Sequence, residues 1–364
     1  MSLRSAFTQI LTSRRVRSVA RGCRAVARTV ARRHRTLVLF YEADEPYSEL
    51  LLDVLPGLAR VYNVDFELRP VGPPDTSAAP EPEKLAQWAR RDAEALRRTY
   101  RIPRSHSDVE ALGDPDDNAR WRQAHGHYGS GMIWFEGEWY WGIDRLHHLE
   151  RRLGANDDEL VFPPIAEPDG PTGGAFDMYF SLRSPYSYLA MMRAPVLAKR
   201  WQADLMLKPI LPMVMRSLPV PRAKQLYIVR DVKREAERFG LPFGRIEDPV
   251  GRGVERGLAV LHQAIPDGKG VDFAQSFYTG VWAEGIDAAS DAGLRRIVER
   301  AGLDWASAQD ALSDESWREA VEANRKEMFA LGQWGVPTFR VGDRAAFGQD
   351  RLWQVGRWLE EGAA

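Results

Sequence analysis

The chain has 364 residues, of which 44% are hydrophobic, so it is long enough to bury two cores. Its 50 Lys and Arg nearly balance its 51 Asp and Glu, and no apolar run reaches the length of a membrane span. The single cysteine, Cys23, excludes an intrachain disulfide and a paired-cysteine redox site, and it is consistent with a reducing cytoplasm.

Residues 1–35 form a basic tail. Residues 1–41 contain ten Arg and neither Asp nor Glu, and the tail lacks the continuous apolar core of a secretory signal. Leu3, Phe7, Ile10 and Leu11 are spaced to form a short apolar stripe on a helix. We expect a disordered extension, with weak contact to an anionic membrane surface or an organelle-targeting segment as the alternatives. Nucleic-acid binding is not expected, because no basic patch with aromatic platforms follows.

Residues 36–153 are predicted to form a first domain. An apolar strand ends near Tyr41, and Pro46 suits the first position of the helix that follows. A second helix is predicted over 81–100. The histidines of this domain have no cysteines or suitably spaced carboxylates beside them, so no metal site is predicted. A Pro- and Gly-rich linker over 154–174 ends the domain.

A second domain is predicted over 175–362. Its first strand, 176–180, is followed by the run Ser184-Pro185-Tyr186-Ser187, in which Pro185 again suits the first position of a helix. Ser184 therefore lies where backbone N–H groups and the positive end of the helix dipole converge. A hydroxyl at this place cannot exchange disulfides, but it can donate a hydrogen bond to a thiolate that a ligand brings.

The two domains repeat one pattern. The run 46–50 matches 185–189 at four positions, and the same difference of 139 in residue number aligns 65–71 with 204–210. The segment 142–146 matches 348–352 with a difference of 206, so the second copy has 67 additional residues between its halves. We therefore predict a tandem duplication, with a helical insertion at about 211–330 in the second copy.

A further motif lies near the end of the chain. Gly335-Val336-Pro337-Thr338-Phe339 runs into a predicted strand, and Gly348-Gln349-Asp350 opens the last predicted helix. Such a run at the start of a strand resembles the cis-proline site of thioredoxin-like folds, so we expect a cis bond before Pro337, an uncommon bond that is usually found in tight turns. It would leave the N–H and C=O of Val336 free to pair with a peptide-like ligand. Asp350 can present a carboxylate to a cationic amine.

These motifs resemble those of the 2-hydroxychromene-2-carboxylate isomerases and kappa-class glutathione transferases, within the DsbA-like thioredoxin superfamily, over about residues 175–362. The resemblance implies an α/β fold with two thioredoxin-like (DsbA-like) domains, the second with the helical insertion. It also implies glutathione as cofactor, a small aromatic or conjugated substrate, and isomerase activity. A kappa-type glutathione transferase and a non-enzymatic thioredoxin-like binding protein are the alternatives.

The resemblance assigns roles to residues of the second domain. Ser184 would favour the thiolate of bound glutathione without being the nucleophile itself. The residues that would bind glutathione are Lys224, Val336, Pro337, Gln349 and Asp350, and those that would line the substrate pocket are Tyr186, Phe277 and Trp282. Two alternatives come from the residues alone: Lys224 as a solvated helical lysine, and the aromatic side chains of 273–287 as core packing. Ser181 replaces an aspartate that the family usually carries.

The first copy differs at the positions that would carry chemistry. Glu45 occupies the position of Ser184, and its carboxylate would repel a bound thiolate. Gly131 occupies the position of Pro337, where a cis bond without proline would cost about 3–4 kcal/mol. We therefore expect a degenerate first copy and one glutathione site per chain.

Overall fold

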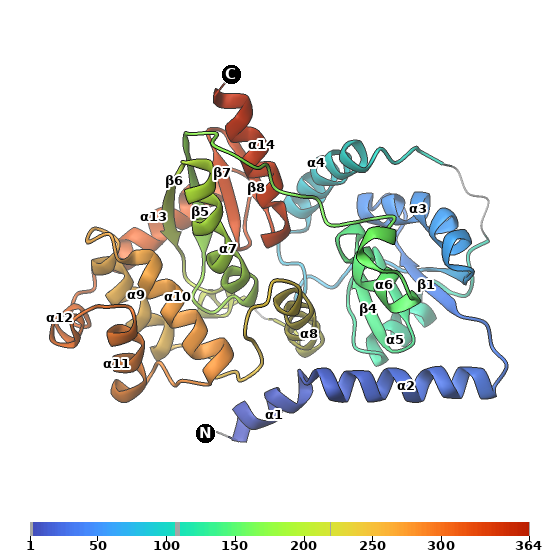
Figure 1. The fold of residues 1–364 in the computed structure, drawn as a ribbon, viewed down its shortest axis with the longest axis horizontal. Helices are drawn as coiled ribbons and strands as arrows, with labels where there is room; N and C mark the ends of the chain where they lie inside the picture. The colour runs from blue at the N-terminus through green and yellow to red at the C-terminus, as the bar shows by residue number, and fades with distance from the viewer. Residues whose placement is uncertain (1–2, 106–109, 219, 364) are drawn as a thin grey trace. The chain divides into compact units, whose positions relative to one another are not determined.

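The computed structural model describes residues 3–105, 110–218 and 220–363 (Figure 1). The chain forms two compact units. The N-terminal unit consists of Arg14–Ile165 and Pro219–Ile228, and the C-terminal unit consists of Met1–Ser13, Ala166–Leu218 and Val229–Ala364. None of the described helices is both long enough and apolar enough to cross a membrane.

The N-terminal unit is built on a four-stranded sheet of order β2-β1-β3-β4. β1 and β2 are parallel, whereas β3 is antiparallel to both β1 and β4. The strands are β1 (Thr36–Tyr41), β2 (Asp65–Pro70), β3 (Met132–Phe135) and β4 (Glu138–Trp141). The helices are α2 (Arg14–Val30), α3 (Pro46–Tyr62), α4 (Pro82–Tyr100), α5 (Pro115–Ala124), η1 (Ile143–Arg145), α6 (Leu146–Leu153) and η2 (Asp157–Glu159).

The C-terminal unit has a sheet of order β6-β5-β7-β8, with one parallel pair, β5 and β6. The strands are β5 (Ala175–Phe180), β6 (Asp204–Pro209), β7 (Thr338–Val341) and β8 (Arg344–Phe347). Its other elements are α1 (Leu3–Leu11), α7 (Pro185–Trp201), η3 (Met213–Arg216), α8 (Arg222–Arg238, which begins in the N-terminal unit), α9 (Arg252–Ala264), α10 (Gly270–Thr279), the π-helix η4 (Gly280–Glu284), α11 (Asp291–Arg300), α12 (Trp305–Ala311), α13 (Trp317–Ala330), η5 (Gln349–Arg351) and α14 (Leu352–Ala363).

The two sheets have the same order and the same register. Thr36 pairs with Asp65 as Ala175 pairs with Asp204, which preserves the difference of 139. Each parallel pair is joined by a helix, α3 or α7, because parallel strands need a crossover connection. The predicted α/β fold class with two thioredoxin-like sheets is confirmed. Duplication as the origin of this match stays a prediction.

The crossover helices begin and end in the same way. Each has a polar side chain at its N-cap and a proline in its first turn, which suits a position where the backbone N–H has no helical partner. Each ends at a residue in the left-handed conformation, Asn63 in α3 and Gln202 in α7. These boundaries place Glu45 and Ser184 at the ends of the central strands β1 and β5.

Both central strands lie within hydrophobic cores. In β1 all four residues of 37–40 are buried, and in β5 Phe176 and residues 178–180 are buried. Strands that are buried on both faces read as continuous apolar runs, which is the pattern that these two sequences show. In the C-terminal unit α10 packs against both α7 and α9, so the helical segment between β6 and β7 covers the crossover helix (Figure 1).

The basic tail is helical, and the expectation of a disordered extension is wrong for its described residues. Residues of α1 contact the loop at 244–246: the Thr8 hydroxyl accepts from the Ile246 N–H at 3.2 Å. In α2, Arg21 and Arg28 pair with Glu138 and Glu136 of the hairpin between β3 and β4. These carboxylates supply the counter-charges that the tail lacks. The side chains of Leu3 and Phe7, from the predicted apolar stripe, lie outside the described part of the structure.

Candidate functional site

Ser184 is the N-cap of α7 in the structure, as the sequence predicts. Its Oγ accepts a hydrogen bond from the Ser187 N–H at 3.1 Å, which satisfies one of the free donors of the first helical turn. The same hydroxyl lies 3.5 Å from the carbonyl oxygen of Val336 and donates toward it. Ser184 is partly exposed, and the first turn of α7 contains no acidic residue, so the positive helix end is not neutralised locally.

The Val336-Pro337 peptide bond is cis, as predicted. Pro337 is buried, whereas Val336 is partly exposed and comes before β7 begins at Thr338. Among the described residues, no backbone group accepts from the Val336 N–H. The Gly348 N–H donates to the Pro337 carbonyl at 2.9 Å, which ties the start of η5 to the proline. The structure thus brings together Ser184, Val336, Pro337 and the segment that carries Gln349 and Asp350.

Gln349 and Asp350 have different environments in η5. Gln349 is buried: its Nε2 donates to Glu235 at 3.1 Å, and its Oε1 accepts from Arg193 at 2.8 Å. The Gln349 amide therefore holds η5 against α7 and α8, and its role as a glutathione ligand stays a prediction. The carboxylate of Asp350 is 22% exposed and lies 3.4 Å from Nη1 of the buried Arg351, so a ligand amine would share it with that guanidinium.

Tyr186 makes a contact that sequence reasoning missed. Its hydroxyl donates to Asp231 Oδ2 at 2.8 Å, and Arg234 donates to the other carboxylate oxygen at 2.8 Å. Asp231 is fully buried on α8, so Tyr186 anchors α8 beside the N-terminus of α7. The difference of 139 is a signal that could have found this pair, because it aligns Asp231 with Asp92, the partner of Tyr47.

Phe277 and Trp282 lie in the core of the C-terminal unit. Phe277 is fully buried, and its ring fills the space beside Gly257, where a Cβ would lie 2.5 Å from Cε2. Trp282, in η4, is 4% exposed and stacks on Phe243 with ring centroids 6.2 Å apart. Both side chains fit core packing, the alternative that their spacing left open. The neighbouring Tyr278 donates to the Ser181 carbonyl at 2.7 Å, which fixes the loop that precedes Ser184.

Lys224 lies in the part of α8 that belongs to the N-terminal unit. Its ammonium donates to the Ala78 carbonyl at 2.6 Å and lies 5.8 Å from the centre of the Tyr128 ring. Burial lowers the pKa of Lys224 from 10.5 to about 8. These contacts differ from those of a solvated helical lysine, and a role in binding glutathione stays a prediction.

In the N-terminal unit, Glu45 is the N-cap that corresponds to Ser184, and its carboxylate fills the end of helix α3. The Glu45 carboxylate accepts from the Tyr47 N–H at 3.1 Å and from the Ser48 N–H at 2.7 Å. Burial raises the pKa of Glu45 above its usual value, although its hydrogen bonds with Ser48 and Tyr47 oppose the shift. Gly131 is next to this carboxylate: a Cβ on Gly131 would lie 3.1 Å from Glu45 Oε2.

The DSBA-like thioredoxin domain family matches residues 175–359. The 2-hydroxychromene-2-carboxylate isomerase of Sphingobium xenophagum is 27% identical over 192 residues, which cover 48% of this chain and 93% of that protein. A solved 2-hydroxychromene-2-carboxylate isomerase structure has 23% identity and a TM-score of 0.45, and the match covers 52% of this chain and 98% of that one. The cytosolic disulfide reductase DsbM from Pseudomonas aeruginosa, solved with GSH (glutathione), has 20% identity and a TM-score of 0.38, over 51% of this chain and 95% of that one. The family match runs from β5 into α14 and includes Ser184, the cis proline and η5.

Proposed function

Because the chain belongs to the DsbA-like thioredoxin family, we propose that its C-terminal unit is a glutathione-dependent isomerase of the 2-hydroxychromene-2-carboxylate isomerase type. The observation that carries the proposal is Ser184. It stands at the helix N-terminus, 3.5 Å from the carbonyl of Val336 and beside the cis Pro337. The name of the relative from Sphingobium xenophagum supports the choice of isomerisation over other reactions of this fold.

The residue at position 184 argues against disulfide exchange. That reaction needs a cysteine whose thiolate attacks a disulfide sulfur. The only cysteine of the chain is Cys23, which is exposed and lies in α2 of the other unit. A serine at the same place can instead stabilise a thiolate that belongs to a bound cofactor. A reducing cytoplasm, where glutathione is held as the thiol, suits such an enzyme.

The geometry around Ser184 fits a peptide thiol. The Val336 N–H and C=O lie in the turn that leads into β7, an inner strand of the sheet, and the cysteinyl backbone of glutathione would pair with them there in an extended conformation. Pro337 would hold that backbone in place. Asp350 would face the cationic amine at the γ-glutamyl end, although its interaction with Arg351 reduces the charge that it offers.

Ser184 can act on a sulfur without losing its place as the helix cap. A hydroxyl has one donor and two acceptor sites. The acceptor side already takes the Ser187 N–H, whereas the donor points toward Val336 over a long 3.5 Å. The Ser184 hydroxyl can therefore donate to a thiolate instead, because the hydrogen bond that it gives up is long and weak. Glutathione, when bound, supplies a nucleophilic thiolate that adds reversibly to a conjugated substrate and leaves unchanged.

Tyr186 is the best-placed residue to contact substrate, because it is partly exposed and two positions after Ser184. Its hydroxyl is held by Asp231, so the ring would be fixed rather than mobile. Phe277 and Trp282, being buried, would shape the pocket from beneath. A kappa-type transferase would use the same Ser184 geometry, but the glutathione sulfur would stay bonded to the electrophile in the product.

Saturable glutathione binding to the whole chain tests the proposal, and we expect one site by calorimetry. A single hydrogen bond to a charged group is worth about 1.5–3 kcal/mol. Ser184→Ala should therefore raise the pKa of the bound thiol by roughly one to two units, measured from thiolate absorbance against pH. Glu45→Ala, at the matching cap of the N-terminal unit, is the control and should leave that pKa unchanged.

Activity is measured on 2-hydroxychromene-2-carboxylate with and without glutathione. Conversion that requires glutathione and falls with Ser184→Ala is expected. Absence of saturable binding would contradict the enzyme and favour a non-enzymatic binding protein. Glutathione binding with an unchanged thiol titration in Ser184→Ala would mean that the serine is only a helix cap.

A further inference from the structure

Helix α2 presents an apolar stripe to solvent. Val16, Val19, Cys23, Val26 and Val30 follow one another at intervals of three and four residues, which places them on one face of a helix. The four valines are 51%, 67%, 63% and 79% exposed, in that order, and Cys23 is also exposed. A surface helix normally buries such a face against its own domain, whereas the apolar face of α2 faces solvent.

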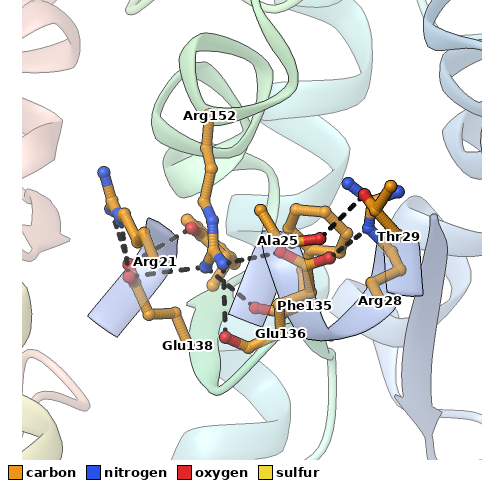
Figure 2. Close-up of polar contacts among 9 residues, drawn as sticks. Arg21, Ala25, Arg28, Thr29, Phe135, Glu136, Glu138 and Arg152 are labelled. Carbon is orange, nitrogen blue, oxygen red and sulfur yellow. Dashed lines mark hydrogen bonds and ion pairs between the residues drawn. The ribbon is translucent and has the colours of Figure 1, made fainter. Parts of the chain in front are cut away.

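The opposite face of α2 sets this orientation, because its arginines bind the β3–β4 hairpin (Figure 2). Arg21 makes a bidentate pair with Glu138, with distances of 2.6 and 2.7 Å. Arg28 Nε donates to Glu136 at 2.7 Å. Arg152, from α6, contacts both glutamates from the other side and donates to the Phe135 carbonyl at 2.9 Å.

The hairpin turn also fits the helix closely. A Cβ on Gly137 would lie 2.3 Å from Arg24 Cζ, so the glycine makes room for that guanidinium at the edge of the docked face. Charge-assisted, bidentate arginine–carboxylate pairs fix orientation as well as position. The acidic turn therefore holds α2 by its basic face and turns the stripe of valines and Cys23 outward.

The charges beside the stripe indicate what covers it. Arg15 is exposed beside the stripe, and Arg14, Arg32 and Arg33 are exposed near the helix ends. Residues 1–41 contain no acidic side chain. If a second copy packed stripe against stripe, these arginines would face one another with like charge. A negatively charged lipid surface complements both the stripe and its flanks.

We propose that α2 is a membrane-surface helix, which docks the protein by its valine stripe on an anionic phospholipid bilayer. The stripe consists of four valines and one cysteine and has no leucine or aromatic residue, so insertion is shallow and binding is reversible. Arg15 and the arginines near the helix ends approach the lipid phosphates, while Arg21, Arg24 and Arg28 stay against the hairpin. This surface is separate from Ser184 and does not depend on the proposed reaction.

The lone cysteine gives a direct test, because a single environment-sensitive fluorophore can be attached to Cys23 in the whole chain. The emission should shift to the blue on vesicles that contain phosphatidylglycerol, and it should not shift on phosphatidylcholine alone. Binding should weaken as salt rises, because about 1 M salt shortens the screening length to about 3 Å. An unlabelled sample that co-sediments with the same vesicles excludes an effect of the dye.

Variants locate the binding face. Val19→Ser with Val26→Ser should weaken vesicle binding roughly tenfold, because two apolar side chains leave the bilayer. Arg15→Ala should weaken it about fivefold. Val196→Ser is the matched control, since Val196 is a similarly exposed valine (59%) on α7, and it should leave binding unchanged. Equal melting temperatures would show that the exposed substitutions preserve the fold.

Three results would overturn the proposal. The first is an absence of both the emission shift and co-sedimentation with anionic vesicles at low salt. The second is an equal loss of binding in Val196→Ser and in the stripe variant. The third is a dimer in sedimentation velocity that the stripe variant dissociates and that does not bind vesicles, which would assign the stripe to a second copy of the chain.

Discussion

Replacing Tyr186 by phenylalanine should loosen the attachment of α8 to α7 in the C-terminal unit. The Tyr186 hydroxyl donates to Asp231 Oδ2 at 2.8 Å, and Asp231 is fully buried. The N-terminal unit has the same arrangement, in which the Tyr47 hydroxyl donates to the buried Asp92 at 2.8 Å. The two tyrosines therefore provide a matched pair of variants within one chain.

The expected cost follows from the charge and burial of Asp231. A hydrogen bond to a charged group contributes about 1.5–3 kcal/mol, and removing one partner leaves the buried acceptor without it. Asp231 keeps its other contact, from Arg234 at 2.8 Å, so the carboxylate is not left wholly unpaired. We therefore expect Tyr186→Phe to lower the local free energy of opening by about 1.5–2 kcal/mol, the lower part of that range.

Amide hydrogen exchange followed by mass spectrometry can assign the effect to one unit, which a global melt of a chain with two units cannot do. Tyr186→Phe should speed exchange in residues 229–238 of α8 and leave α4 unchanged. Tyr47→Phe should do the reverse. An Asp231→Asn background should reduce the effect of Tyr186→Phe, because the acceptor is then neutral. Unchanged exchange in 229–238, or equal changes in α4 and α8, would refute the reasoning.

Two further predictions concern Lys224 and Gly257. Burial lowers the pKa of Lys224 to about 8, so folding disfavours its charged form. The free energy of unfolding of the parent, relative to that of Lys224→Met, should rise as pH increases from about 8 toward 10.5. Below pH 8 this difference in free energy should not change with pH. A difference that stays constant over the whole range would contradict the prediction. Gly257→Ala should cost about 1–3 kcal/mol in urea denaturation, because its Cβ would lie 2.5 Å from the Phe277 ring. Gly57→Ala, with nothing within 4 Å of its Cβ, is the control, and a Gly257→Ala protein as stable as the parent would count against the packing argument.

The parts of the structure that could be predicted are those whose signal is local. Ser184 and Pro185 specify a helix start through capping and a fixed φ, and the structure has α7 begin there. The run around Pro337 resembles the cis-proline site of thioredoxin-like folds, and this resemblance predicts the cis bond that is present. The repeat at a difference of 139 predicts two matching sheets, and their strand registers agree residue for residue.

The parts that could not be predicted depend on partners far along the chain. The arginines of 14–35 indicated disorder because no acid lies near them in sequence, but Glu136 and Glu138 are more than a hundred residues away and order α2. Gln349 looks like a polar residue at a helix start, and only the fold shows that Arg193 and Glu235 bind its amide. The spacing of the aromatic residues could not show whether Phe277 lines a pocket or packs in the core, because both roles produce the same helical pattern.

Glu45 and Gly131 are adjacent in the N-terminal unit, and each suits the other. The Glu45 carboxylate accepts from the N–H groups of Tyr47 and Ser48, whereas Ser184, among the described residues, accepts only from the Ser187 N–H at the start of α7. A side chain at Gly131 would press on that carboxylate, since its Cβ would lie 3.1 Å from Oε2. Gly131 also has φ of +62°, which an L side chain rarely adopts. Restoring serine at position 45 alone would therefore leave the neighbouring backbone unlike that of Pro337, so we expect Glu45→Ser to create no second glutathione site.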